Sequence, residues 1–223
     1  MNTSVITALQ AGTKPPLMLT SIPELKEHEQ IDPFHLEELK RELVRDGYQR
    51  DPITVDANYK VILDGHHRVK ILETLGCLKI AVHYVDYLND ANIRVKAWYP
   101  VVMDSERSLL KLLRESGMNV HTEARGNSGH LVFRDRVLTV KSDRKRVMGV
   151  LVGKARMDYV PSEAFAKKLV ETGRASCAII FDPISKEDVV EAALSGDPFP
   201  PKTTRHIFPT RPRNWFIPLS DLT

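Results

Sequence analysis

The chain has 223 residues, of which 42% are hydrophobic and 27% are charged, and its formal net charge is +3. These values are typical of a globular protein with a buried core and exclude a largely disordered chain. Lys and Arg are only slightly in excess and are interspersed with Asp and Glu. This distribution of charge argues against a long groove that binds nucleic acid.

The sequence contains neither a secretory signal pattern nor an apolar run of about 18 residues, so we expect a cytoplasmic protein without membrane contact. The two cysteines, Cys77 and Cys177, lie far apart in the chain. We expect them to be free, buried thiols rather than a disulfide in a reducing compartment.

The first half of the chain alternates strand and helix patterns. After a short strand at 17–20, Asp32 and Pro33 predict the start of a helix that runs to about Arg45 and ends before Gly47. Apolar runs and glycines then predict strands at 52–56 and 60–63, a helix at 66–75, and strands at 79–85 and 94–99. These elements form a predicted first domain, residues 1–103.

The second half predicts a further domain, residues 104–223. Asp104 is the expected N-cap of a helix that ends at Gly117. A hairpin at 131–133 and 136–140, helices at 161–172 and 185–194, and a strand at 178–181 follow. The segment Ser185-Lys-Glu-Asp188 resembles a capping box in which Asp replaces Glu. Three prolines then interrupt regular structure before the polar stretch 202–206. The overall prediction is an α/β (α+β) protein with a second α/β domain.

The segment Asp64-Gly65-His66-His67-Arg68 predicts an anion site, because a strand here passes through glycine into the start of a helix. Backbone N–H groups and the helix dipole attract anions at such a point. A carboxylate beside a phosphate requires a bridging cation, so Asp64 suggests Mg²⁺. The same residues also fit a simple helix cap with solvated histidines, whereas a zinc site from two adjacent histidines is not expected.

Two further polar segments and one aromatic segment are candidates for a site. Glu29, in the sequence His-Glu-Gln, is a possible general base, although an isolated glutamate is commonly a surface residue. Residues 202–206 offer hydroxyls and cations that suit a phosphate or a carboxylate, or form a solvated basic loop. Trp98 fits either the core or the wall of a small-molecule pocket.

These segments together are similar to one family. The strand followed by Gly-x-x-Arg at a helix start resembles the ParB/sulfiredoxin-like superfamily. Within it, HEQ at 28–30, DGHHR at 64–68, WYP at 98–100 and PKTTRH at 201–206 resemble the ADP-dependent free L-serine kinases. The likeness extends from about Leu17 to Pro212. Walker A, GxGxxG and protein-kinase catalytic-loop motifs are absent, so any phosphoryl transfer uses another scaffold.

The resemblance implies transfer of a phosphoryl group from ADP to the hydroxyl of L-serine, which gives AMP and O-phospho-L-serine and feeds cysteine biosynthesis. By resemblance, Glu29 is the catalytic base and Asp64 is an essential acidic residue that binds Mg²⁺. The implied nucleotide and phosphate ligands are Gly65, His66, His67, Arg68, Thr203, Thr204, Arg205 and His206. The implied contacts to serine are His67, Trp98 and Lys202. The sulfiredoxin cysteine has no counterpart, because His66 stands at that position.

Two alternatives remain open at the level of sequence. One is a kinase that uses ATP, or that phosphorylates another small hydroxyl compound. The other is a ParB-like nucleotide-binding protein that associates with DNA, which should carry a basic helix-turn-helix that the second half does not clearly contain. We therefore expect L-serine and an adenine nucleotide as partners and no nucleic acid.

Overall fold

The computed structural model of the chain describes residues 5–6, 17–122 and 129–223. Contacts divide the chain into two compact units. The first unit contains Met1–Val95, Ser185–Pro201 and His206–Thr223, and the second contains Lys96–Ile184 and Lys202–Arg205. The predicted domain division, 1–103 and 104–223, remains a prediction; it is a single cut along the chain, whereas each compact unit combines segments that are distant in sequence.

The first unit is built on a mixed sheet with helices beside it. Its described strands are β1 (Val5–Ile6), β2 (Leu17–Ser21), β3 (Lys26–Glu27), β4 (Tyr48–Arg50), β5 (Ile53–Asp56), β6 (Val61–Asp64), β7 (Lys79–Val85) and β16 (Phe216–Pro218). Its described helices are η1 (Ile22–Glu24), α1 (Pro33–Asp46), α2 (His66–Thr74), α6 (Lys186–Ser195) and η2 (Leu219–Asp221). Among these residues the sheet has the strand order β1-β2-β7-β5-β6-β3.

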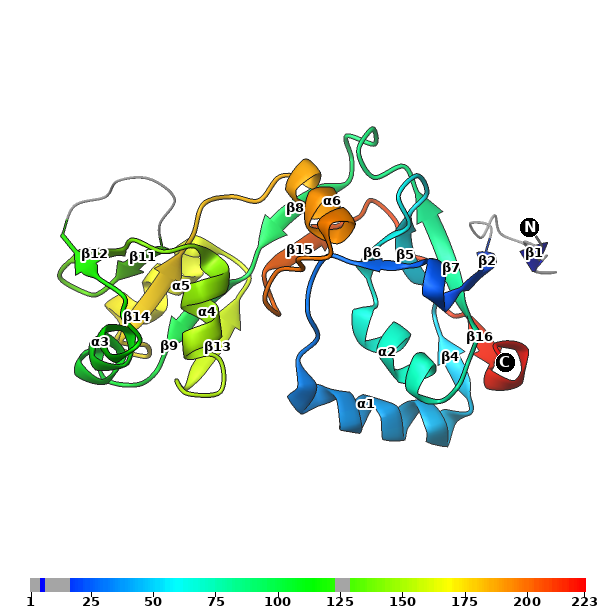
Figure 1. The fold of residues 1–223 in the computed structure, drawn as a ribbon, viewed down its shortest axis with the longest axis horizontal. Helices are drawn as coiled ribbons and strands as arrows, with labels where there is room; N and C mark the ends of the chain where they lie inside the picture. The colour runs from blue at the N-terminus through cyan, green and yellow to red at the C-terminus, as the bar shows by residue number, and fades with distance from the viewer. Residues whose placement is uncertain (1–4, 7–16, 123–128) are drawn as a thin grey trace. The chain divides into compact units, whose positions relative to one another are not determined.

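The central strands of this sheet are covered on both faces. All four residues of β5 and the first three of β6 are buried, as expected for strands with packed layers on either side. In Figure 1, α1 and α2 lie together on one side of the sheet and α6 lies on the other. Val69 and Leu72 of α2 pack with Ile53 and Ile62 in one core.

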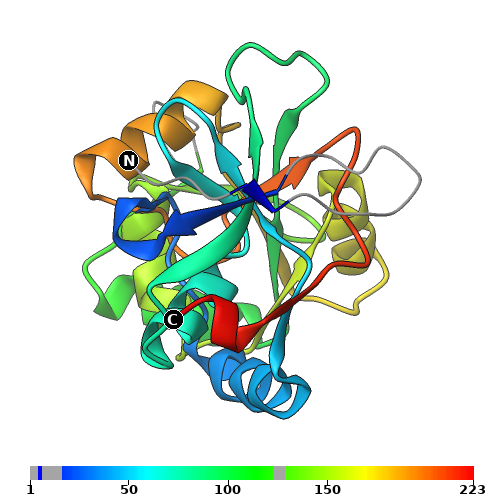
Figure 2. The same ribbon diagram turned by 90° about the vertical axis from the view of Figure 1, so that its right-hand side faces the viewer.

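The end of the chain returns to the first unit and completes its core. Trp215, Ile217 and Leu222 belong to the same core cluster as Ile53. Strand β16 pairs antiparallel with β4, so the C-terminal segment runs beside it (Figure 2). The chain reaches this pairing through the irregular segment that follows β15 (Thr204–Ile207).

The second unit is an antiparallel sheet between helices. Its described elements are β9 (Tyr99–Val102), α3 (Glu106–Glu115), β10 (Val120–His121), β11 (Gly129–Val132), β12 (Val137–Val140), α4 (Arg144–Leu151), β13 (Met157–Val160), α5 (Glu163–Glu171) and β14 (Cys177–Ile180). Among the described residues the strand order is β10-β12-β11-β14-β9-β13. Strand β8 (Arg94–Ala97) and β15 form a separate two-stranded sheet.

Period-two alternation gives this second sheet its two apolar faces. Val102 and Cys177 pack in the cluster that contains Leu109 of α3 and Val147 of α4. Their neighbours Val101 and Ala178 pack in the cluster that contains Ala166 of α5. Successive residues of a strand point to opposite faces, so each strand serves both cores.

Most of the predicted elements are confirmed. The strands expected at 17–20, 52–56, 60–63 and 79–85 are β2, β5, β6 and β7, and the helices expected from Pro33 and His66 are α1 and α2. Ser185 and Asp188 form the expected capping box of α6. Cys77 and Cys177 are free and buried, as expected.

Three local predictions are wrong. The N-cap of α3 is Ser105, whose side chain accepts from the Ser108 N–H, while Asp104 accepts from the backbone N–H of Arg156. The strand expected at 94–99 is two strands, and the second, β9, pairs with β13 and β14. Residues 204–207 form β15 rather than an irregular loop. In each case a contact with a segment distant in sequence, rather than a local preference, decides the structure.

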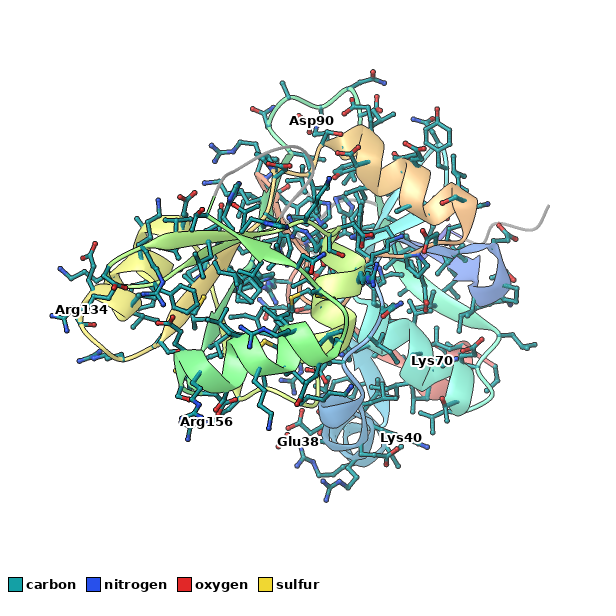
Figure 3. All side chains as sticks on the ribbon, turned by 60° about the vertical axis from the view of Figure 1, so that its left-hand side comes forward. Glu38, Lys40, Lys70, Asp90, Arg134 and Arg156 are labelled. Carbon is teal, nitrogen blue, oxygen red and sulfur yellow. The ribbon has the colours of Figure 1, made fainter. Side chains whose placement is uncertain are left out.

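Many of the charged side chains lie at the surface. Lys70, Arg134 and Arg156, for example, extend away from the ribbon in Figure 3. Among the described residues, no helix is both long enough and apolar enough to cross a membrane.

Candidate functional site

The junction of β6 and α2 has the geometry that the sequence predicted. Strand β6 ends at Asp64, and Gly65 is the N-cap of α2 with φ 112° and ψ 19°. A Cβ atom at Gly65 would lie 2.4 Å from Cγ2 of Ile53. Both the left-handed backbone and the close packing therefore require glycine. Because glycine has no side chain, it leaves the first turn of α2 without a side-chain cap.

Two arginines share one oxygen of the Asp64 carboxylate. Nη2 of Arg68 lies 3.5 Å from Oδ2 of Asp64, and Nη1 of Arg211 lies 2.9 Å from the same atom. The Asp64 side chain keeps 39% of its surface exposed. A carboxylate and two guanidinium groups thus stand at the exposed end of a buried strand.

Arg68 is held mainly by the backbone. Its Nη1 donates to the carbonyl oxygens of Asp51 at 2.8 Å and Pro52 at 3.1 Å. Burial lowers the pKa of Arg68 from its ordinary value, and the neighbouring carboxylates of Asp64 and Asp51 oppose that shift. This arginine therefore ties α2 to the turn that precedes β5.

Three histidines from distant parts of the chain meet beside this junction. The ring of His28 lies 4.7 Å from that of His66 and 5.3 Å from that of His206, edge to face in both cases. Nδ1 of His28 donates to the carbonyl oxygen of Ile62 at 2.7 Å, and Nε2 of His206 lies 2.8 Å from the Tyr87 hydroxyl. The cluster joins the segment before α1, the start of α2 and strand β15.

Burial keeps these histidines neutral at physiological pH. It lowers the pKa of His28 to about 4, against the smaller, opposite effect of its bond to Ile62. It lowers the pKa values of His66 and His206 still more clearly, with His28 adding to the shift in both. Nε2 of His66 is buried and has no hydrogen-bond partner among the described residues. Such an atom is costly to maintain and is a candidate for ligand contact.

The segment that contains Glu29 is fixed by backbone pairing. The N–H of Phe199 donates to the carbonyl of His28, and the N–H of Gln30 donates to the carbonyl of Phe199, each at 2.8 Å. Nε2 of His67 lies 3.2 Å from both the nitrogen and the oxygen of the Asp32 backbone. Glu29 is half-buried. The residues on either side of it are thus tied to α2 and to the segment after α6.

A second group of the predicted residues gathers around Trp98 in the second unit. Nζ of Lys202 lies 5.9 Å and Cζ of Arg205 lies 5.6 Å from the centre of the Trp98 ring, within cation–π range. Nη2 of Arg205 donates to the carbonyl of Pro161, and its Nε is buried without a partner among the described residues. Thr203 and Thr204 are buried.

The sequence-predicted residues therefore fall into two groups. The first unit contains Glu29, Asp64, Gly65, His66, His67, Arg68 and His206; the second contains Trp98, Lys202, Thr203, Thr204 and Arg205. Sequence reasoning missed His28, Tyr87 and Arg211. The pair of arginines in Arg211-Pro212-Arg213 was a usable signal, because the planar guanidinium group suits contacts to carboxylates and phosphates. Nothing local distinguished Tyr87.

Asp64, at the β6–α2 junction, is the residue that the sequence predicted as a ligand of Mg²⁺. Among the described residues, no group of three or more His, Cys, Asp or Glu side chains could hold a metal ion. Mg²⁺ is nevertheless commonly bound by one or two carboxylates together with substrate phosphates and water. Asp64 supplies one partly exposed carboxylate of this kind.

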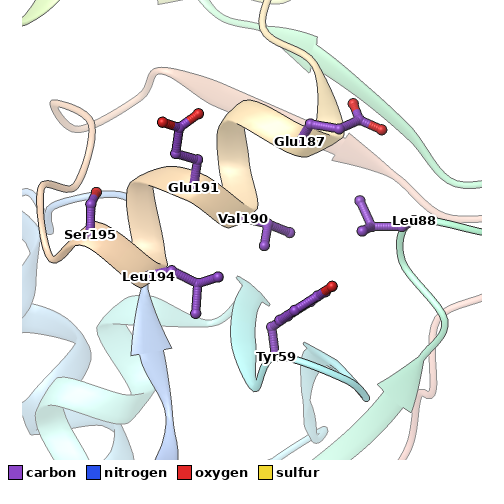
Figure 4. A pocket seen from close by; sticks show the side chains of 7 residues that line it. All are labelled: Tyr59, Leu88, Glu187, Val190, Glu191, Leu194 and Ser195. Atoms are coloured by element: carbon purple, nitrogen blue, oxygen red, sulfur yellow. The ribbon is translucent and has the colours of Figure 1, made fainter.

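An apolar pocket of about 500 Å³ lies elsewhere on the first unit. Figure 4 shows its lining, from α6, the β5–β6 turn and the segment after β7: Tyr59, Leu88, Glu187, Val190, Glu191, Leu194 and Ser195. None of the predicted site residues lines it. The pocket offers space, but none of these lining residues has a cationic side chain that could bind a phosphate.

Comparison with known proteins gives relatives over most of the chain. It is 30% identical to a ParB-like protein of Sulfolobus acidocaldarius, over 75% of this chain and 78% of the relative. It is 26% identical to an ATP-dependent L-serine kinase of Staphylothermus marinus, over 92% of this chain and 90% of the relative. It is 25% identical to the ADP-dependent L-serine kinase SerK of Thermococcus kodakarensis, over 90% of each. No family model matches the sequence.

A solved structure has the same fold. A structure described as a free serine kinase in complex with AMP matches with a TM-score of 0.85 at 24% identity, over 96% of this chain and 98% of that one. The match confirms the fold class that the sequence predicted.

Proposed function

This chain belongs to the ParB-like protein family, with L-serine kinases among its relatives, and we propose that it is itself a free L-serine kinase with ADP as the phosphoryl donor. The alignments to kinases of both donor types extend over about nine tenths of the chain. Their length supports a shared reaction rather than a shared fragment.

The observation that carries the proposal is the meeting of charged and polar groups at the β6–α2 junction. Asp64, Arg68 and Arg211 stand at the strand end, and the neutral histidines His28 and His66 contact each other beside the first turn of α2. Phosphoryl transfer needs positioned donors for the phosphate oxygens and little covalent chemistry from the protein. The junction supports that role because Arg68 and the histidines are held in place by contacts that are wholly or partly buried.

In the proposed reaction, the serine hydroxyl oxygen attacks the terminal phosphorus of ADP. The new O–P bond forms as the bond to the bridging oxygen breaks, and AMP leaves with that electron pair. Glu29 accepts the hydroxyl proton. The paired backbone around Glu29 supports this assignment, because a general base must be held within hydrogen-bond reach of its substrate.

The remaining residues at the junction would bind and orient the nucleotide. The N–H groups at the start of α2, together with His66, are proposed donors to the phosphates, and His206 is proposed to line the phosphate site beside them. Asp64 would hold Mg²⁺, which, when bound, neutralises charge on the phosphate oxygens. His67, fixed by Asp32, is a proposed contact to serine.

The Trp98 group is proposed to serve the same reaction. Trp98 and Lys202 would contact serine, and Thr203, Thr204 and Arg205 would bind phosphate. Substitution of Trp98 by Leu should raise the KM for serine and leave ADP affinity unchanged. A normal KM in that variant, with intact folding by circular dichroism, would remove Trp98 from the site.

The donor and the acceptor are the two finer points of the proposal. ATP is a second candidate donor, because the Staphylothermus relative is named as ATP-dependent. Formation of O-phospho-L-serine would also agree with a cytoplasmic role in cysteine biosynthesis. The remaining alternative is a ParB-like nucleotide-binding protein on DNA, which the name of the Sulfolobus relative keeps open.

One assay separates these possibilities. Purified protein is incubated with Mg²⁺ and either ADP or ATP, against serine, threonine and homoserine, and AMP, ADP and the phosphorylated amino acid are quantified. Serine-dependent AMP release from ADP is the expected result. Turnover with ATP alone would replace the donor, and no turnover with any acceptor, together with salt-dependent binding of duplex DNA, would reject the kinase.

A further inference from the structure

The two arginines on Asp64 have different surroundings. Arg68 lies on α2 and Arg211 on the irregular segment between β15 and β16. Both reach Oδ2 of Asp64, Arg211 at the shorter distance of 2.9 Å. Their other contacts decide which of them can move.

Arg68 is committed to the backbone of the turn before β5. Nη1 donates to two carbonyl oxygens, of Asp51 and Pro52, within 3.1 Å. A Cβ atom at Gly65 would lie 3.2 Å from its Nη2, so the guanidinium is packed directly against the N-cap of α2. Movement of Arg68 toward a ligand would leave those carbonyls without this donor and open the packing at Gly65.

Arg211 is held by fewer and more exposed contacts. Apart from Asp64, its Nη2 donates to the carbonyl of His206 at 3.1 Å, and its Cζ lies 5.0 Å from the centre of the Phe208 ring. Its side chain is 37% exposed. The contact with the His206 backbone keeps it at the junction, and the remaining donors of the planar guanidinium can turn toward another anion without a change of fold.

A phosphate that binds near Asp64 changes the electrostatic interactions of its carboxylate. The carboxylate repels the phosphate, and a guanidinium binds two phosphate oxygens in the same fork geometry that it offers a carboxylate. We propose that Arg211 leaves Asp64 for the terminal phosphate of the nucleotide and so frees the carboxylate for a cation. Arg68, which the resemblance assigned to phosphate, instead stays in place as a positioning residue. This inference rests on the proposed nucleotide-dependent function.

The test measures binding of ADP with Mg²⁺ to the full chain by calorimetry, together with thermal unfolding. Arg211→Gln should weaken ADP binding about 10- to 100-fold, the loss of one or two charge-assisted bonds, with little change in Tm. Arg68→Gln should instead lower Tm clearly. Arg213→Gln is the matched control, because Arg213 is 66% exposed and pairs with Asp51. It should bind ADP and unfold like the unsubstituted protein.

The outcomes separate this inference from the proposed function. Unchanged ADP affinity in Arg211→Gln, with the unsubstituted protein binding normally, overturns the role of Arg211 alone. A fall in Tm for Arg211→Gln as large as that for Arg68→Gln also overturns it, because both arginines would then be structural. Failure of the unsubstituted protein to bind any adenine nucleotide rejects the proposed function, and the role of Arg211 with it.

Discussion

Two regions of the first unit differ in what they offer a ligand. The pocket beside α6 provides space, and its walls are mainly Tyr59, Leu88, Val190 and Leu194. The β6–α2 junction provides instead a carboxylate, two guanidinium groups and a cluster of buried histidines. Buried polar groups cost free energy unless they are paired or used. The contrast teaches that chemistry, rather than cavity volume, marks the candidate site of this protein.

The largest effect should be a loss of stability when a side chain is added at Gly65, in the β6–α2 junction. Gly65→Ala combines backbone strain at φ 112° with a clash against Ile53, and should cost about 2–6 kcal/mol of unfolding free energy. Gly76→Ala is the control, because Gly76 also has a positive φ but has nothing within 4 Å of an added Cβ. Urea denaturation of the two variants would show equal losses if the crowding at Ile53 were unimportant.

The next effect concerns the proposed base beside His28. Glu29→Gln keeps the shape of the side chain and removes its ability to accept a proton, so turnover should fall about 100- to 10 000-fold while ADP binding is retained. Steady-state kinetics and calorimetry measure the two properties separately. The exposed neighbour Gln30 supplies a control, Gln30→Ala, which should stay near normal. Near-normal turnover in Glu29→Gln would exclude the assigned role.

A third effect follows from the neutral histidines. The pKa of His28 is about 4 in the folded protein and about 6.5 in the unfolded chain, so the unfolded chain binds more protons between these values. The contribution of neutral His28 to the free energy of unfolding is therefore fully present above about pH 6.5 and is lost as the pH falls toward 4. The loss from His28 alone is on the order of 3 kcal/mol.

Urea midpoints measured from pH 7.5 to 4.5 test this expectation. His28→Gln should flatten the dependence, whereas the same change at the exposed His121 should leave it unaltered. A midpoint that does not fall below pH 6.5 in the unsubstituted protein would contradict the account of a buried, neutral cluster.

The smallest effect should come from the pocket. Leu194 is 51% exposed on its rim. Leu194→Ser should change stability by about 0.5 kcal/mol or less and leave kcat/KM within about twofold of normal. A tenfold fall in kcat/KM would mean that the pocket takes part in the reaction, and that the β6–α2 junction is not the only region that matters for it.

Local signals in the sequence predicted much of the fold and the local geometry of the central part of the candidate site. Pro33 and Gly47 limited α1, and Ser185 with Asp188 marked the start of α6. The β6–Gly65–α2 turn was predicted from residues that are neighbours in sequence, because a strand end, a glycine and a helix start are all local features. Helix α4 was missed, since three of its first residues, from Arg144 to Arg146, are basic and oppose the usual charge preference of a helix start.

By itself, the sequence selected the short segments that are proposed to carry the chemistry: Glu29, the turn from Asp64 to Arg68, and residues 202–206. Only the tertiary structure decided that His28, His66 and His206 share one cluster, that Arg68 serves the backbone, and that Arg211 reaches Asp64 across 147 positions of the chain. The reason is physical. Caps and turns depend on residues a few positions apart, whereas burial, lowered pKa values and shared carboxylates arise only when distant segments pack together.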